Sequence, residues 1–274
     1  FVLQLIENPR MHWATVGEYL FNPSVLDGLG MTLLLTVLAT AAAYVIGTIV
    51  AILQLASNPG LKLIGGLYVW ALRSIPQLVL LLIFFNLAAF VPVIELGLPG
   101  FGLTLGEIDS RRLISGFAAA LIGLSLSEGA YAAEVVRGGI ISVDKGQAEA
   151  ASALGIPQRR IFFRIVLPQA MRAIVPALGN AVIGMLKTTS LVSTIAVHDL
   201  LYNVQIIYNA NFQVIPLLIV ATIWYLVWTT VLSVVQYFVE SHYGKGYRGT
   251  RTTAKKGFFR KLIDDPASVL SGRR

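Results

Sequence analysis

The chain has 274 residues, of which 56% are hydrophobic and only 13% are charged, and its mean hydropathy is +0.74. Soluble domains carry about a quarter charged residues, so most of this chain is expected to face lipid or other buried helices. It has no cysteine, which excludes disulfides, thiolate metal sites and cysteine nucleophiles. The net charge of +7 does not indicate nucleic-acid binding, because nine of the 21 Lys and Arg residues lie in the last thirty positions.

Long apolar runs predict the membrane spans, because roughly 20 apolar residues cross the core of a bilayer. We expect five spans, at about residues 31–55, 63–92, 113–136, 171–195 and 214–239. The fold is therefore expected to be all-α and polytopic, with five visible transmembrane helices. Residues 1–6 are mostly apolar and leave room for one more span upstream.

The second predicted span contains Arg73 and Pro76. Pro76 lacks an amide hydrogen, so we expect the helix to kink there. Arg73 is expected to reach back to the cytoplasmic lipid headgroups rather than to contact a substrate. Residues 92–112 follow this span and are rich in Gly and Pro, so we expect a loop there.

The distribution of Lys and Arg predicts the orientation, since short cytoplasmic loops carry an excess of both. If the polar segment 138–168 is cytoplasmic, its side of the membrane holds sixteen Lys and Arg, against three on the other side. We therefore expect residues 1–29 to be an extracytoplasmic N-terminal segment and 30–243 to be the transmembrane domain with a cytoplasmic loop at 138–168. Residues 244–274 are expected to form a basic cytoplasmic tail on anionic lipid.

The polar segment 138–168 is longer than a connection between two helices needs. Asp144 is placed to cap a helix, and Gly155 is placed to end it in a left-handed conformation. Glu149 offers a charge, while Ala150 and Ala151 let another protein surface approach closely. The segment is therefore predicted to be a helical knob that fits a groove on a soluble subunit. The alternative is an amphipathic hairpin that lies on the membrane.

The spacing from Glu149 through Gly155 to Leu167 and Pro168 resembles the coupling loop of ATP-binding-cassette (ABC) importer permeases. The surrounding stretches 128–134, 137–140, 145–147, 167–170 and 187–191 resemble the polar amino-acid branch of that family. The resemblance covers roughly residues 26–240, and it implies the type I importer permease fold. It also implies that the ATPase-coupling residues are Glu149, Ala150, Ala151, Gly155 and Arg159.

The same resemblance implies the partners and the place of the protein. A cytoplasmic ATPase dimer would receive the Glu149 helix in a groove and bind the ATP and Mg, so that this chain needs no cofactor. A second permease subunit, identical or homologous, and an extracytoplasmic amino-acid-binding protein would complete the importer. We expect the chain to be a multi-pass protein of a bacterial plasma membrane, with the N-terminal segment outside and the C-terminus cytoplasmic.

Ionisable groups inside predicted spans indicate the substrate path, because such groups usually face the bundle interior or water. Glu128 lies in the third span and Lys187 in the fourth, and the two could form an ion pair that only joins helices. We expect the path of an amino acid to be lined by Ser127, Glu128, Lys187, Thr188, Thr189 and Ser190. Many relatives carry an acid where this chain has Thr188, which weakens the case for a cationic substrate.

The sequence gives no support for catalysis by this chain. Gly179, Gly184 and Lys187 do not have the spacing of a phosphate-binding loop and lie inside an apolar run. The three histidines are far apart in the sequence, so neither a metal site nor a catalytic pair is expected. A secondary amino-acid transporter or channel is the main alternative function, followed by a membrane enzyme or a structural scaffold.

Overall fold

The computed structural model describes residues 11–90, 93–98, 103–109 and 115–243. The expected upstream span at 1–6 and the basic tail at 244–274 lie outside these residues. The described elements, in chain order, are α2 (Trp13–Leu20), α3 (Pro23–Leu55), α4 (Pro59–Ser74), α5 (Gln77–Phe85), α6 (Leu87–Phe90), β1 (Val93–Leu98), β2 (Leu103–Asp109), α8 (Gly116–Ile141), α9 (Lys145–Ala153), α10 (Gln158–Ile161), the π-helix η3 (Phe162–Val166), α11 (Leu167–Thr188), the 3₁₀-helix η4 (Thr189–Ile195), α12 (Leu200–Asn211) and α13 (Val214–Tyr243).

Among the described residues, four helical segments are long and apolar enough to cross a membrane. They are α3, α8, the continuous run Gln158–Ile195 and α13. The pair α4 and α5 counts as a fifth span if the bent pair is taken as one, in agreement with the five predicted runs. The bend between them is 100° and lies at Ile75 and Pro76, so the predicted kink at Pro76 is confirmed as a full break.

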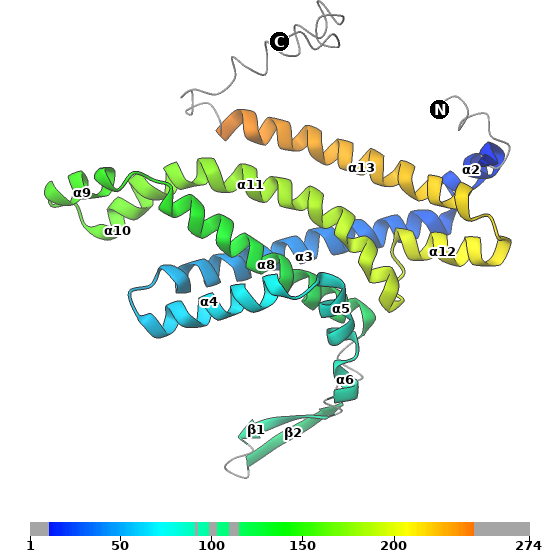
Figure 1. Ribbon diagram of the computed structural model, residues 1–274, viewed down its shortest axis with the longest axis horizontal. Helices are drawn as coiled ribbons and strands as arrows, with labels where there is room; N and C mark the ends of the chain where they lie inside the picture. Colours follow the sequence, from blue (N-terminus) through cyan, green and yellow to red (C-terminus); the bar gives the residue numbers. More distant parts are fainter. Residues whose placement is uncertain (1–10, 91–92, 99–102, 110–114, 244–274) are drawn as a thin grey trace, which may run out of the picture.

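The long helices α3, α8, α11 and α13 run side by side along the long axis of the molecule (Figure 1). The short helices α9 and α10 lie at the same end as the turn between α3 and α4, whereas α2 and α12 lie at the opposite end. Helix α3 begins earlier than the predicted first span. Asn22 caps it by accepting a hydrogen bond from the Ser24 amide at 2.9 Å, and Pro23 occupies its first turn.

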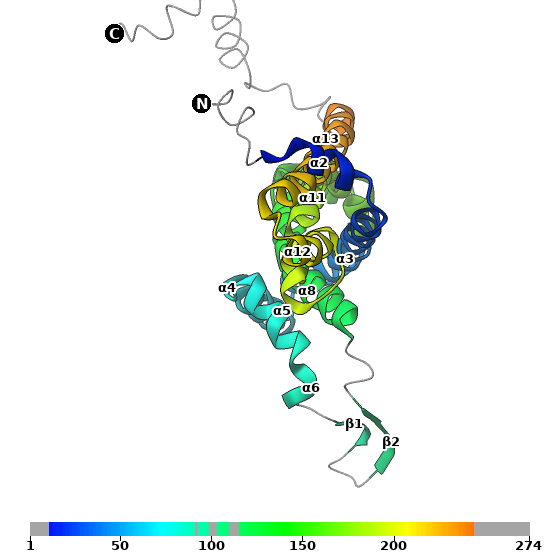
Figure 2. The same ribbon diagram turned by 90° about the vertical axis from the view of Figure 1, so that its right-hand side faces the viewer.

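The segment predicted as a loop at 92–112 contains an antiparallel hairpin, so that prediction is wrong for residues 93–98 and 103–109. Strand β1 pairs with β2 from Val93 opposite Asp109 to Leu98 opposite Leu103. Both stretches contain β-branched residues, and the residues between them are Pro-Gly-Phe-Gly, a composition typical of turns. The bundle is helical as expected, and this two-stranded sheet is attached to it through α6 (Figure 2).

Small residues allow the helices of the bundle to approach closely, as is usual between membrane helices. A Cβ atom placed on Gly47 of α3 would lie 2.6 Å from the Cβ of Ala132 on α8. A Cβ on Gly139, near the end of α8, would overlap the side chain of Ile174 on α11. Helix α8 is therefore held directly against both α3 and α11.

Candidate functional site

Helix α9 has a defined cap at each end, as the sequence predicted. A carboxylate oxygen of Asp144 accepts a hydrogen bond from the Gly146 amide at 2.8 Å. Gly155 has a positive φ of 74°, its amide donates to the Ser152 carbonyl at 2.9 Å, and the Ile156 amide donates to the Ala151 carbonyl at 3.2 Å. This pair of hydrogen bonds is the Schellman motif, which stops a helix sharply at a glycine.

The polar segment is a helical hairpin rather than an extended loop. We call residues 142–161, which contain α9 and α10, the coupling hairpin. The Gln158 side chain joins its two helices by donating a hydrogen bond to the Ser152 hydroxyl at 2.9 Å. Helix α10 then continues through the π-helix η3 into α11 without an intervening coil. The hairpin and α11 are therefore joined by one uninterrupted helical run.

The exposed face of the coupling hairpin includes most of the residues expected to couple to an ATPase. The side chains of Glu149, Ala150 and Arg159 are exposed, as is Gly155. Ala151 differs, because it is only 5% exposed and packs inside this chain, so its side chain does not face a partner. Leu154 is 80% exposed, which is unusual for a large apolar residue in a polar segment. The sequence analysis missed Leu154, although its position directly before the glycine cap was a usable signal.

One residue at the start of the coupling hairpin, Val143, packs against a small apolar cluster from three long helices. The cluster consists of Ala51 of α3, Val136 of α8, and Ala170 and Ile174 of α11. Gly139 adds a direct backbone approach of α8 to Ile174. The three long helices are therefore close-packed at the point where the hairpin leaves α8.

The residues expected to line the substrate path divide into exposed and buried ones. Glu128 is half-buried and lies close enough to the Tyr44 hydroxyl of α3 to interact with it electrostatically. Lys187 is exposed, and Thr188 and Ser190 are partly exposed. Ser127 and Thr189 are only 3% and 0% exposed, so a substrate cannot reach them in this conformation of the single chain.

The ion pair that Glu128 and Lys187 could have formed is not present. Among the described residues, the single ion pair joins Glu134 to Arg137 of the same helix, at 2.7 Å. The hydroxyls after Lys187 bond to their own helix: Thr188 to the Gly184 carbonyl at 3.0 Å, and Ser190 to the Lys187 carbonyl at 2.7 Å. Such bonds leave the hydroxyl oxygens available as acceptors.

Arg73 lies against an aromatic ring of another helix. It lies near the last residue of α4, whose first residue, Pro59, follows the turn at the hairpin end of the molecule. The guanidinium carbon lies 5.0 Å from the centre of the Tyr131 ring of α8. Arg73 is about 21 Å along the helix from Pro59.

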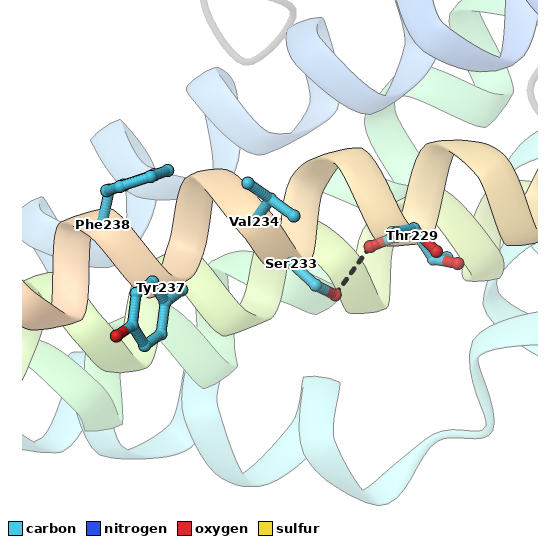
Figure 3. Close-up of a pocket in the computed structure, with 6 residues that line it drawn as sticks. Thr229, Ser233, Val234, Tyr237 and Phe238 are labelled. Atoms are coloured by element: carbon cyan, nitrogen blue, oxygen red, sulfur yellow. Dashed lines mark hydrogen bonds between the residues drawn. The ribbon is translucent and has the colours of Figure 1, made fainter.

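A shallow depression of about 330 Å³ on α13 is lined by a single helix. Its hydroxyl groups are committed to that helix: Ser233 bonds to the Thr229 carbonyl at 2.6 Å (Figure 3), and Thr230 bonds to the Leu226 carbonyl at 2.7 Å. The exposed Tyr237 and Phe238 complete its lining. None of the predicted site residues lies here, and the geometry fits packing against lipid or another helix better than a ligand site.

At the other end of the bundle, Asp199 fixes α12 against α3. Its side chain accepts a hydrogen bond from the Tyr202 amide at 2.9 Å, and the next amide, of Leu200, donates to the Thr32 hydroxyl at 3.0 Å. Asp199 is fully buried, and the second oxygen of its carboxylate makes no hydrogen bond within the described residues. Burial raises the pKa of Asp199 to about 6.

Known proteins resemble this chain over most of its length. Residues 43–245 match the family described as binding-protein-dependent transport system inner membrane component. The chain is 40% identical to the arginine transport system permease protein ArgU of Corynebacterium glutamicum, over 92% of this chain and 78% of that protein. It is 34% identical to the histidine/lysine/arginine/ornithine transport system permease protein HisQ of Escherichia coli, over 84% of this chain and 97% of the relative.

The fold is also that of a solved transporter. A crystal structure of an amino acid ABC transporter with histidines superposes on this chain with a TM-score of 0.68 and 33% sequence identity, covering 81% of this chain and 95% of that one. Together with the exposed hairpin between two spans, these matches identify the class of protein. The chain belongs to the family of inner-membrane components of binding-protein-dependent transport systems and is a permease subunit of an amino-acid ABC importer.

Proposed function

We propose that a polar amino acid crosses a bacterial plasma membrane through this subunit, and that a separate ATPase dimer drives the transport through the coupling hairpin. A second permease subunit, identical or homologous, and an extracytoplasmic amino-acid-binding protein complete the importer. The ATPase binds the ATP and Mg, and this chain holds no cofactor. The relatives named for arginine, glutamine and cystine transport support a polar amino acid as the substrate class.

The observation that carries this proposal is the shape and attachment of the coupling hairpin. Its tip exposes Glu149, Ala150 and the apolar Leu154, and its second helix is continuous with α11 through η3, while Val143 packs on a cluster of α3, α8 and α11. A groove on the ATPase that changes shape between nucleotide states binds the tip differently in each state. Only such a difference in binding can shift the helices between two arrangements.

The charges near the hairpin support a cytoplasmic position for this end. Among the described residues, those at the hairpin end include Lys62, Arg137, Lys145, Arg159, Arg160, Arg164 and Arg172. At the opposite end, the helices α2 and α12 contain no Lys or Arg, and acids such as Glu18 and Asp199 lie there. The positive-inside rule then orients the N-terminal segment outward and the C-terminus toward the cytoplasm.

The accessible members of the expected substrate path are the better candidates for contact with the amino acid. Glu128, Lys187, Thr188 and Ser190 are at least partly exposed in the single chain, and they lie on α8, at the end of α11 and at the start of η4. Ser127 and Thr189 contribute to the path only if the helices separate during transport.

Reconstitution into vesicles tests the proposal. The permease is assembled with its ATPase and binding protein, and radiolabelled amino acids are offered at the binding-protein side. We expect the amino acid to accumulate only when ATP is present on the ATPase side, and to do so even with an uncoupler. Glu149→Lys should abolish this accumulation although the variant still inserts into the membrane. Uptake that an ion gradient drives without ATP would instead identify a secondary transporter.

A further inference from the structure

Helix α11 has a weak point at Pro176, in the middle of its length. Proline has no amide hydrogen, so the carbonyl of Arg172, four residues earlier, loses its usual helical partner, and helices bend at such positions. The part of α11 before Pro176 is continuous with the coupling hairpin, and the part after it ends at Lys187 and Thr188. A bend at Pro176 would therefore separate the movement of the hairpin from that of the far end of α11.

Two side chains from other helices bond to the backbone of α11 at this weak point. The side-chain amide of Gln236 on α13 donates a hydrogen bond to the Pro176 carbonyl at 2.8 Å. The hydroxyl of Tyr44 on α3 donates one to the Leu178 carbonyl, two residues further on. Gly179 allows Gln236 to come this close, because a Cβ atom there would overlap its amide oxygen. Helix α11 is thus tied to both α13 and α3 next to its proline.

Gln236 is a polar side chain in an apolar part of α13, and it is only 6% exposed. A buried amide costs free energy unless it is hydrogen-bonded. Its nitrogen makes two bonds, as many as it has hydrogens, since it also donates to the Glu240 carboxylate at 2.9 Å. The same carboxylate oxygen accepts a bond from Asn180 of α11 at 3.3 Å. Gln236 and Glu240 therefore hold α11 over a full turn, from Pro176 to Asn180.

Apolar packing holds α11 firmly only before the proline. Ile174 is 3% exposed and lies in the cluster that also contains Val136 of α8. Along residues 175–182, α11 instead borders an open crevice of about 380 Å³, whose other wall is formed mainly by α13. A helix beside such a crevice lacks the close contacts that resist bending in a packed interior. The hydrogen bonds from Gln236 and Tyr44 are therefore the contacts that oppose a bend at Pro176.

We propose that Gln236 and Tyr44 brace α11 at Pro176, so that a movement of the coupling hairpin reaches the far end of the helix. Both are positioning residues, because they act through the backbone of α11. This inference rests on the proposed function and adds to it the residues that keep ATP hydrolysis coupled to transport. The competing interpretation is that α11 has to bend at Pro176 during transport, which would make the proline essential.

The test measures how many amino acids enter per ATP hydrolysed, in vesicles that contain the complete importer. The substrate is the amino acid that wild-type vesicles accumulate fastest, chosen from the twenty. Gln236→Leu removes the side-chain amide and keeps a side chain of similar size, whereas Tyr44→Phe removes only the hydroxyl. Each should lower this ratio about 2- to 10-fold, the effect of one net hydrogen bond on an equilibrium, while ATP hydrolysis continues.

A change of the proline distinguishes bracing from a general loss of stability. Pro176→Ala supplies the missing amide hydrogen, so the braces become unnecessary. Alone it should transport as wild type does, and the double variant Gln236→Leu/Pro176→Ala should recover the wild-type ratio. Tyr68→Phe is the matched control, because Tyr68 donates the same kind of bond, to the Leu126 carbonyl at 2.7 Å, but joins α4 to α8. It should keep the wild-type ratio.

Three results would overturn the inference. The first is a wild-type ratio in Gln236→Leu, which is the cleaner probe because Tyr44 also lies beside Glu128 of the expected substrate path. The second is a double variant whose ratio stays as low as that of Gln236→Leu. The third is loss of transport in Pro176→Ala alone, which would show that α11 has to bend there.

The test remains decisive if one variant does not assemble. Native mass measurement reports whether each permease pair still holds its ATPase. Should Gln236→Leu fail to assemble, Tyr44→Phe with and without Pro176→Ala provides the same comparison. Failure of the proposed function is distinct, since wild-type vesicles would then show no ATP-driven uptake of any amino acid.

Discussion

The left-handed cap at Gly155 gives the sharpest prediction about the coupling hairpin. Its φ of 74° is available to glycine but costs another L-residue about 1–2 kcal/mol, and the space around it is open, so the cost of a side chain there is conformational. Gly155→Ala should therefore weaken the end of α9 by that amount. Because 1–2 kcal/mol corresponds to a factor of roughly 5–30 in an equilibrium, the ATPase should bind the variant about 5- to 30-fold more weakly.

The assay is the dissociation constant between purified permease and ATPase, measured by a surface-based or thermophoretic method in detergent. Gly155→Asn is the matched variant, because asparagine adopts the left-handed conformation more readily and should lose less affinity. Gly138→Ala is the control for adding a methyl group, since its Cβ would meet nothing within 4 Å. If Gly155→Ala bound the ATPase as tightly as wild type, the capped end of α9 would not be part of the docking surface.

Three further predictions concern the bundle and its polar residues. Gly139→Leu should overpack against Ile174, which costs about 1–3 kcal/mol of folding free energy, and should therefore lower the unfolding temperature. Gly138→Ala should not lower it. Because burial raises the pKa of Asp199 from 3.8 to about 6, its ionisation opposes folding by up to about 3 kcal/mol above pH 6 and not at all below about pH 4. Asp199→Asn should thus raise the unfolding temperature at pH 7.5 but not at pH 4, and equal temperatures at pH 7.5 would refute this. Glu128→Gln should reduce ATP-driven uptake while the ATPase still co-purifies, and unchanged uptake would remove Glu128 from the substrate path.

The sequence predicted the membrane helices well, because their signal is composition and length. Five apolar runs correspond to α3, the α4–α5 pair, α8, the run Gln158–Ile195 and α13. It missed α2 and α12, which are short, and the hairpin β1–β2, whose Gly and Pro content suggested a loop. It also predicted only a kink at Pro76, since the size of a bend depends on what the two halves pack against.

The local structure of the coupling hairpin was predictable because helix caps depend on residues close in the sequence. Asp144 and Gly155 cap α9 as expected. The sequence predicted less well which residues face outward. Ala151 turns inward and Leu154 outward, and this depends on how the hairpin meets η3. Arg73 and Glu128 depend on contacts between helices distant in the sequence, so neither the stacking on Tyr131 nor the absence of an ion pair with Lys187 could be derived from spacing.

Site-directed cross-linking tests most directly whether α9 docks on the ATPase. The chain has no native cysteine, so one introduced at the exposed Ala150 is a unique attachment point for a short photo-cross-linker. We expect Ala150→Cys to cross-link to the ATPase in the assembled importer with a yield that changes when ATP binds, while Asn209→Cys, exposed at the other end on α12, gives no product. An importer that transports normally yet gives no ATPase cross-link from Ala150→Cys in any nucleotide state would contradict the account.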